Sequence, residues 1–274
     1  MGLSSPLSSQ LSTPNSTIRL LSTDFDGTLV GHDADPPVSP ALFEALATLQ
    51  ARGCLWAINT GRELHHIIEG LAEYGFPMKP DYVLTAEREV FQQASDGSWQ
   101  DFGDWNARCA AAHDALFEDS SELLAAVEAF LETVPGAQMI HMGGRTVGLV
   151  TLTDPDMDRV CRFLEKERAR VPGFQFMRNT VYVRFCHEDY SKGTALAELG
   201  RLCGLDRDAI FATGDHYNDL PMLDGTHARW VACPANAVEA VQRAVHLAGG
   251  YVATREHGDG VVEALRHFGA LSET

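Results

Sequence analysis

Apolar and polar residues follow two different rhythms along this chain. Up to residue 86, short apolar runs alternate with longer segments in which apolar residues recur every three or four positions. The short runs predict buried strands and the longer segments predict amphipathic helices. The predicted order is strand 17–25, helix 39–53, strand 54–61, helix 62–75 and strand 81–86. Short connections between these elements favour parallel strands joined by right-handed crossovers.

The rhythm changes in the middle of the chain and then returns. Three pairs of strand-like runs indicate hairpins, at 89–93 with 97–102, 137–142 with 146–152, and 174–178 with 180–185. Two amphipathic segments, 119–134 and 153–171, indicate helices, the first with Asp119 as its cap. After Tyr190 the alternation of helix and strand resumes as far as residue 269.

These patterns predict an α/β fold with a doubly wound, Rossmann-like parallel-sheet core that is split in sequence by an α+β insert. We expect the core to comprise residues 18–85 and 188–274 and the insert to comprise residues 86–187. Residues 1–17 are rich in Ser, Thr and Pro, which indicates a flexible tail. Ligands of doubly wound sheets bind beyond the carboxyl ends of the strands.

Polar residues gather where the predicted core strands end. They are Asp24 and Asp26 after the first strand, Asn59, Thr60, Gly61 and Arg62 after the second, and Asp215, Asn218 and Asp219 after the strand at 209–214. Lys192 opens the helix that follows the insert. Because the carboxyl ends of parallel strands share one edge of a sheet, we expect these groups to lie together.

This set of groups suits metal-assisted phosphoryl chemistry. Asp24 and Asp26 alternate in an extended chain, so both carboxylates would point the same way and repel each other. A hard divalent ion such as Mg²⁺ would relieve this repulsion. One carboxylate could attack phosphorus to form an acyl phosphate, and the other could protonate the leaving oxygen and then deprotonate water. Lys192 would neutralise the crowded charge, and Thr60 with the Gly61 N–H would cradle phosphoryl oxygens.

Four motifs in order carry a family resemblance: "DFDGT", "NTGR", "SKG" and "GDHYNDLPML". In these motifs the chain resembles the haloacid dehalogenase (HAD) superfamily of phosphohydrolases. The insert lies between the second and third motifs, as in the cap of the Cof-type branch, which includes sugar phosphatases. One departure is "TAEREVF", which stands where many Cof-type chains have Asn-Gly-Ala, and it leaves the substrate-side contact there open.

The resemblance implies a role for each motif residue. Asp24 would be the nucleophile and a metal ligand, and Asp26 the general acid/base, with its main-chain carbonyl on the metal. Asp215 would bind Mg²⁺, and Asp219 would support the metal directly or through water. The phosphate would contact Thr60, Gly61, Lys192 and Asn218. Arg62 is a candidate substrate contact or a surface residue.

Charge and composition narrow the partners. The formal net charge of −17 disfavours nucleic acid and anionic membrane surfaces. No run of apolar residues is long enough to span a membrane. Six cysteines without a C-x-x-C pair are typical of reduced thiols and weakly favour a cytoplasmic location. The oligomeric state does not follow from the sequence.

The leading hypothesis is a Mg²⁺-dependent phosphatase that hydrolyses a small phosphorylated metabolite through an aspartyl-phosphate. By resemblance alone, the metabolite is a sugar phosphate. One alternative is a phosphotransferase or mutase of the same superfamily, but the mutases known have their cap after the first motif. A second alternative is a non-catalytic protein that binds a phosphorylated metabolite. The intact set of Asp24, Asp26, Lys192 and Asp215 argues against it.

Overall fold

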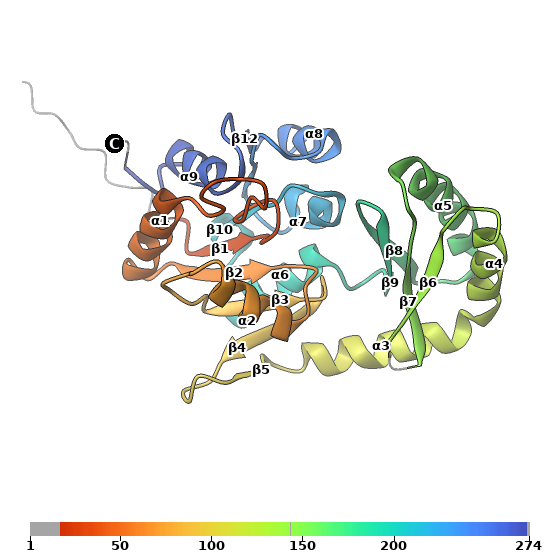
Figure 1. Ribbon diagram of the computed structural model, residues 1–274. Helices are drawn as coiled ribbons and strands as arrows, with labels where there is room; N and C mark the ends of the chain where they lie inside the picture. Colours follow the sequence, from red (N-terminus) through yellow and green to blue (C-terminus); the bar gives the residue numbers. More distant parts are fainter. Residues whose placement is uncertain (1–16, 143, 273–274) are drawn as a thin grey trace, which may run out of the picture.

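The computed structural model describes residues 17–142 and 144–272, so the predicted tail, apart from Thr17, lies outside the described residues. The described chain forms two sheets (Figure 1). One has eight strands in the order β12-β11-β10-β1-β2-β3-β4-β5, and the other has four in the order β6-β7-β9-β8. The two sheets lie in separate parts of the molecule, and the part with the larger sheet contains both the beginning and the end of the described chain.

Six strands of the large sheet are parallel. They are β1 (Leu20–Thr23), β2 (Leu55–Asn59), β3 (Tyr82–Thr85), β10 (Ile210–Thr213), β11 (Trp230–Cys233) and β12 (Tyr251–Val252). The central strand β1 lies between β2 and β10, with Thr23 level with Ile58 on one side and Thr213 on the other. The carboxyl ends of these three strands therefore reach the same edge of the sheet.

Helices cover both faces of this sheet. They are α1 (Pro40–Ala51), α2 (Leu64–Glu73), α6 (Lys192–Leu202), α7 (Leu220–Leu223), α8 (Glu239–Leu247) and α9 (His257–His267). Successive strand residues point to opposite faces. Leu21 accordingly packs in the apolar cluster under α1, α2 and α9, whereas Leu20 packs in the cluster under α6, α7 and α8. A sheet buried on both faces explains why its strands are apolar throughout, and the predicted doubly wound α/β class is confirmed.

The first predicted hairpin belongs to the large sheet and not to the separate part. β4 (Glu89–Gln93) pairs antiparallel with β3, and β5 (Trp99–Asp101) pairs with β4. The insert was predicted to begin at residue 86, but the chain leaves the large sheet only after β5. The reason is that Val90, which is fully buried, shares an apolar cluster with Leu84 of β3.

Among its described residues, the smaller part contains four antiparallel strands and three α-helices. These are α3 (Trp105–Asp119), α4 (Ser121–Leu131), β6 (Gln138–Met142), β7 (Arg145–Val150), α5 (Asp154–Glu167), β8 (Phe174–Asn179) and β9 (Tyr182–His187). Its core joins the apolar faces of α4 and α5 to residues of β7 and β9. Helix α3 was not predicted, because alanines and polar residues interrupt its apolar period. Asp119 ends this helix instead of capping the next one, which Ser120 precedes.

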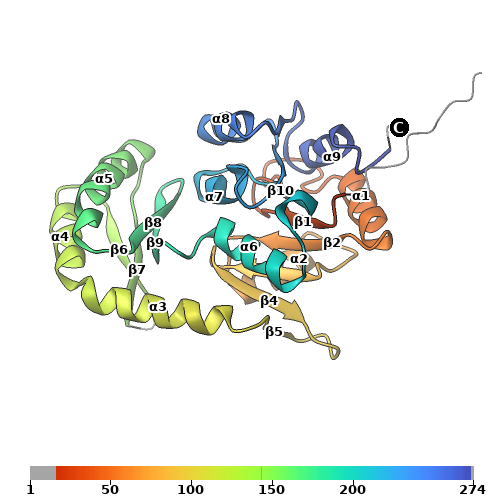
Figure 2. The same ribbon diagram turned by 180° about the vertical axis from the view of Figure 1, so that it is seen from behind.

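Helix α3 and strand β9 connect the two parts, as the view from behind shows (Figure 2). The ring of His113, on α3, packs against the end of β9, and the residue is 5% exposed. One ring nitrogen, Nδ1, is 2.8 Å from the Cys109 carbonyl, and the other, Nε2, accepts the main-chain N–H of His187 at 3.1 Å. These partners fit a neutral ring that donates at Nδ1 and accepts at Nε2. Burial, with a smaller contribution from Arg88, lowers the pKa of His113 to about 4.

No helix among the described residues is both long enough and apolar enough to cross a membrane.

The buried ring predicts a pH dependence of stability. The pKa of His113 is below its ordinary value of 6.5 in the folded chain, so the unfolded chain binds more protons between pH 6.5 and 4. The free energy of unfolding should therefore decrease as the pH falls through this window, by at most about 3 kcal/mol from this residue. Denaturant unfolding at several pH values should show a shallower decrease for His113→Gln. The exposed His246→Gln should behave like the parent, and equal slopes for all three proteins would refute the assignment.

Candidate active site

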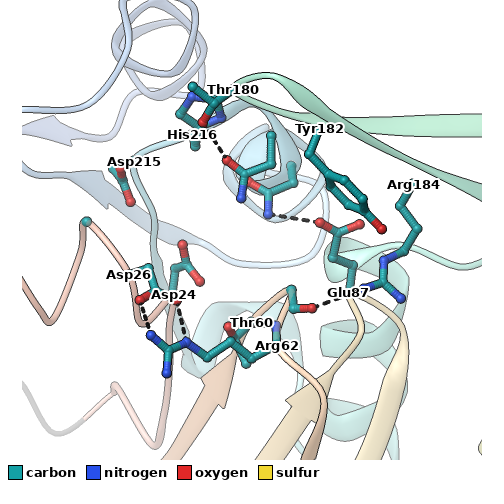
Figure 3. A pocket seen from close by; sticks show the side chains of 14 residues that line it. Asp24, Asp26, Thr60, Arg62, Glu87, Thr180, Tyr182, Arg184, Asp215 and His216 are labelled. Atoms are coloured by element: carbon teal, nitrogen blue, oxygen red, sulfur yellow. Dashed lines mark hydrogen bonds and ion pairs between the residues drawn. The ribbon is translucent and has the colours of Figure 1, made fainter. Parts of the chain in front are cut away.

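The candidate site lies at the carboxyl edge of the large sheet. Asp24 follows β1, and its main-chain N–H donates to the Thr213 carbonyl at 2.9 Å. Thr60 follows β2, and its N–H donates to the Leu84 carbonyl of β3 at 2.9 Å. Asp215 follows β10 by two residues. The three segments therefore meet at one edge of the sheet, where the sequence analysis expected them (Figure 3).

Three acidic side chains meet at this edge. One carboxylate oxygen from each of Asp24, Asp215 and Asp219 lies within 4.8 Å of the others. The ammonium Nζ of Lys192 is 2.8 Å from Asp24 Oδ1 and 2.6 Å from Asp219 Oδ1. Lys192 and Asp219 are fully buried, and Asp24 is nearly so. The Asp24 and Asp219 carboxylates thus share one buried ammonium, and the Asp215 carboxylate lies beside them at the cavity.

Local packing explains how Lys192 reaches the acids. Ser191 caps α6 by accepting the main-chain N–H of Thr194, which makes Lys192 the first helical residue. The helix start approaches α7 so closely that a Cβ on Gly193 would lie 2.1 Å from the Pro221 carbonyl oxygen. A positive charge at a helix N-terminus is unfavourable, so its acidic neighbours must compensate. Burial alone would lower the pKa of Lys192, but Asp219 and Asp24 raise it above its ordinary value.

Asp219 holds the loop after β10 in place. Its Oδ2 accepts the main-chain N–H groups of Asp215 and His216, each at 2.8 Å, while its Oδ1 accepts from Lys192. Both oxygens are therefore already engaged by the chain itself. The Asp215 carboxylate, in contrast, accepts one side-chain hydrogen bond, from Thr28 Oγ1 at 2.7 Å, and faces the cavity.

The acids fit a divalent cation. Burial raises the pKa of Asp24 well above its ordinary value, with repulsion from Asp219 adding to the effect and Lys192 opposing it. Burial, again with Asp219, raises the pKa of Asp215 to about 7. Lys192 offsets only part of this repulsion, so the carboxyl group of Asp215 tends to retain a proton near neutral pH. A cation between Asp24 and Asp215 would remove that tendency, and carboxylate oxygens are the ligands that Mg²⁺ prefers.

Asp26 has different partners from Asp24. Its carboxylate forms a two-pronged ion pair with Arg62, at 2.7 Å from Nε and 2.6 Å from Nη2, and it lies 2.9 Å from Nε2 of His32. Both carboxylates line the same cavity, but strand alternation is not what places them there. Strand β1 ends at Thr23, so neither acid belongs to a strand, and the chain turns at Gly27, whose φ is +78°.

Thr60, Gly61 and Asn218 line a cavity of about 340 Å³ together with Asp24, Asp26, Arg62 and Asp215. Lys192 and Asp219 lie buried beneath it. Asn218 is 2% exposed; its Nδ2 donates to Glu87 Oε1 at 3.0 Å, and its Oδ1 has no partner among the described residues. The structure thus brings together all the residues singled out in the sequence.

Several residues of the cavity were not singled out as candidate site residues. They are Glu87 and His216 from the large part, and Asn179, Thr180, Tyr182 and Arg184 from the β8–β9 hairpin of the smaller part. Glu87 belongs to the "TAEREVF" segment, whose departure from Asn-Gly-Ala was the available signal. The four hairpin residues carried none, because their facing depends on how the two parts are placed.

Comparison with known proteins places the chain in a family. The model of the haloacid dehalogenase-like hydrolases matches residues 21–86 and 147–265. A Streptococcus pyogenes protein that carries the name "Putative phosphatase" is 23% identical over 91% of this chain and 98% of its own length. The sucrose-phosphatase of Synechocystis sp. PCC6803, solved with sucrose and phosphate, has a TM-score of 0.67 at 22% identity, covering 91% of this chain and 97% of that one.

A further solved structure, a sugar phosphatase of HAD subclass IIB, has a TM-score of 0.59 at 18% identity and covers 92% of this chain and all of its own. At these identities the structures support the fold, while the family model covers most of the chain. The predicted superfamily and enzyme class are confirmed. This chain belongs to the haloacid dehalogenase-like hydrolase family.

Proposed function

We propose that this enzyme is a Mg²⁺-dependent phosphatase that hydrolyses a small phosphorylated metabolite, and that the metabolite is a sugar phosphate. The observation that carries the proposal is the Asp24 carboxylate, which lines the cavity beside Asp215 while Lys192 holds its other side. The names of the sucrose-phosphatase and the subclass IIB sugar phosphatase favour the sugar-phosphate class.

The carboxylates of Asp24 and Asp215 and the main-chain carbonyl of Asp26 would hold the Mg²⁺ ion. When bound, the ion supplies positive charge that keeps both carboxylates ionised and offsets charge on the phosphoryl oxygens. Asp219 would act beside this site, because its oxygens already fix Lys192 and the loop that carries Asp215. The raised pKa values of Asp215 and Asp24 support this assignment, because a bound cation would stabilise the ionised form of both carboxyl groups.

The proposed reaction has two displacements at phosphorus. In the first, an Asp24 oxygen bonds to phosphorus, the phosphorus–oxygen bond to the leaving group breaks, and protonated Asp26 gives its proton to that oxygen. In the second, Asp26 takes a proton from water as the water attacks phosphorus. The bond to Asp24 breaks, and inorganic phosphate leaves. Lys192 holds Asp24, while Thr60 and Gly61 border the space where phosphoryl oxygens would lie.

The ion pair with Arg62 competes with the proposed acid/base role of Asp26. In the present arrangement the Arg62 guanidinium holds the Asp26 carboxylate, 37% exposed, in an ion pair. For proton transfer Asp26 would have to turn from Arg62 toward the leaving oxygen. We therefore propose Arg62 as a positioning residue for Asp26, in addition to the substrate contact expected from the sequence.

The nucleophile and the metal can be tested together. Purified protein should release inorganic phosphate from p-nitrophenyl phosphate with Mg²⁺, and EDTA should abolish the release. Asp24→Asn should lower kcat by roughly 1,000-fold or more, because an amide is not a nucleophile toward phosphorus. The exposed Asp206→Asn provides the matched control and should keep the parent rate.

Three outcomes would speak against the proposed function. An active Asp24→Asn variant would remove the nucleophile assignment. Phosphate that appears on an added alcohol instead of in solution would favour the phosphotransferase alternative. A protein that binds phosphate esters but never releases phosphate would favour the binding-protein alternative.

The buried ion pairs also predict a stability effect. Lys192→Met removes the ammonium but leaves the buried carboxylates of Asp24 and Asp219 without their partner. Breaking one side of a buried pair typically destabilises a protein by about 3–5 kcal/mol. Thermal and denaturant unfolding should show this loss for Lys192→Met, whereas Lys166→Met on the exposed surface of α5 should not. A Lys192→Met protein as stable as the parent would contradict the proposed coupling.

A further inference from the structure

The loop that follows β3 holds Glu87 in a conformation that is unusual for its residue type. The φ angles of Ala86 and Glu87 are +49° and +66°, in the left-handed region that favours glycine. Glu87 is nevertheless 5% exposed, and its main-chain N–H donates to the Thr60 carbonyl at 3.1 Å. Non-glycine residues persist in this region when the surroundings over-determine them, often at ligand sites.

The Glu87 carboxylate is only half satisfied. Its Oε1 accepts from Asn218 Nδ2 at 3.0 Å, but its Oε2 is buried without a hydrogen-bond partner in the part of the chain that the structure describes. The Glu87 carboxylate also lies close to Gly61 of the second motif, since a Cβ built on Gly61 would be 3.3 Å from Glu87 Oε1. A buried acceptor without a partner is costly unless a ligand supplies a donor.

Strand β9 of the smaller part brings a complementary donor to the same cavity. Tyr182 and Arg184 are two residues apart, so they share one face of the strand, and both line the cavity (Figure 3). The Arg184 side chain is 11% exposed, with Nη1 at 3.4 Å from Glu63 Oε1 and Nη2 at 3.3 Å from the Gly61 carbonyl. Its Nε is buried, and no residue of 17–142 or 144–272 accepts a hydrogen bond from it.

The two unsatisfied groups have opposite hydrogen-bonding character. Glu87 Oε2 can only accept and Arg184 Nε can only donate, yet the two residues do not form an ion pair with each other. A ligand hydroxyl group can both donate and accept, so it has the hydrogen-bonding capacity that each of the two groups requires. The cavity, at about 340 Å³, falls within the range of about 300–1,000 Å³ usual for small-molecule sites.

We propose that Glu87 and Arg184 form a recognition subsite for hydroxyl groups on the leaving group, which selects uncharged, polyhydroxylated phosphate esters over apolar or amino-substituted ones. The inference rests on the proposed phosphatase function and specifies its substrate class. Glu87 comes from the catalytic part and Arg184 from the smaller part, so selection needs both parts in place. An apolar leaving group would leave both partners unsatisfied.

The test measures kcat/KM for glucose 6-phosphate, its 2-, 3- and 4-deoxy analogues, phosphoethanolamine and p-nitrophenyl phosphate. Glu87→Gly suits the left-handed backbone and should fold, and Arg184→Met removes the donor from the other side. A lost hydrogen bond to a charged group corresponds to about a 10- to 100-fold change. Each variant should therefore lower the ratio of kcat/KM for glucose 6-phosphate to that for p-nitrophenyl phosphate by at least about 10-fold. The exposed Glu118→Gln on α3 should leave the ratio unchanged.

The parent protein should also discriminate against at least one deoxy analogue, and Glu87→Gly should lose that discrimination. A ratio that does not change in Glu87→Gly would overturn the proposal, since a purely structural role would affect all substrates alike. Preference of the parent for phosphoethanolamine would overturn it as well, because the subsite would then recognise an ammonium group. Failure of the parent to hydrolyse p-nitrophenyl phosphate with Mg²⁺ would instead count against the proposed function itself.

Discussion

The buried ammonium of Lys192 between Asp24 and Asp219 is the interaction on which the rest of this site depends. Removing charges from water is expensive, and such a group is tolerated only when its partners are close and well oriented. Here the partners come from the end of β1 and the loop after β10, while the lysine comes from the start of α6. These ion pairs therefore join three segments that are distant in sequence. The single ammonium does not balance the negative charge of the site, as the raised pKa of Asp24 indicates.

The chemistry and the candidate selectivity meet in the segment after β10. Tyr217–Asp219 forms a short 3₁₀ turn that supplies Asp219 to Lys192 and Asn218 to Glu87. The β8–β9 hairpin reaches the same turn, with the Arg178 guanidinium 5.2 Å from the centre of the Tyr217 ring. The smaller part therefore contacts the same turn that places the buried acids. As a cover over the cavity, it would exclude water from the reacting atoms and present Arg184 to the leaving group.

Much of the fold and of the candidate site could be predicted because strand ends are a local signal. Asp24, Thr60 and Asp215 each follow an apolar run, and parallel pairing then places them at one edge. The direction of Asp26 could not be predicted, because the strand ends before it and its partner Arg62 follows a different strand. The placement of β4 and β5 depends on Val90 burying against Leu84, which is a non-local contact. Glu87 and Arg184 face each other only once the two parts are in place.

The most direct measurement of the central claim is a crystal structure of the protein grown with Mg²⁺ and beryllium trifluoride, a mimic of a phosphoryl group on a carboxylate. We expect the mimic on a carboxylate oxygen of Asp24, with the ion between Asp24 and Asp215 and with Lys192 still in contact with Asp24 and Asp219. A mimic bound to another residue, or an ion located away from these carboxylates at saturating Mg²⁺, would contradict the claim.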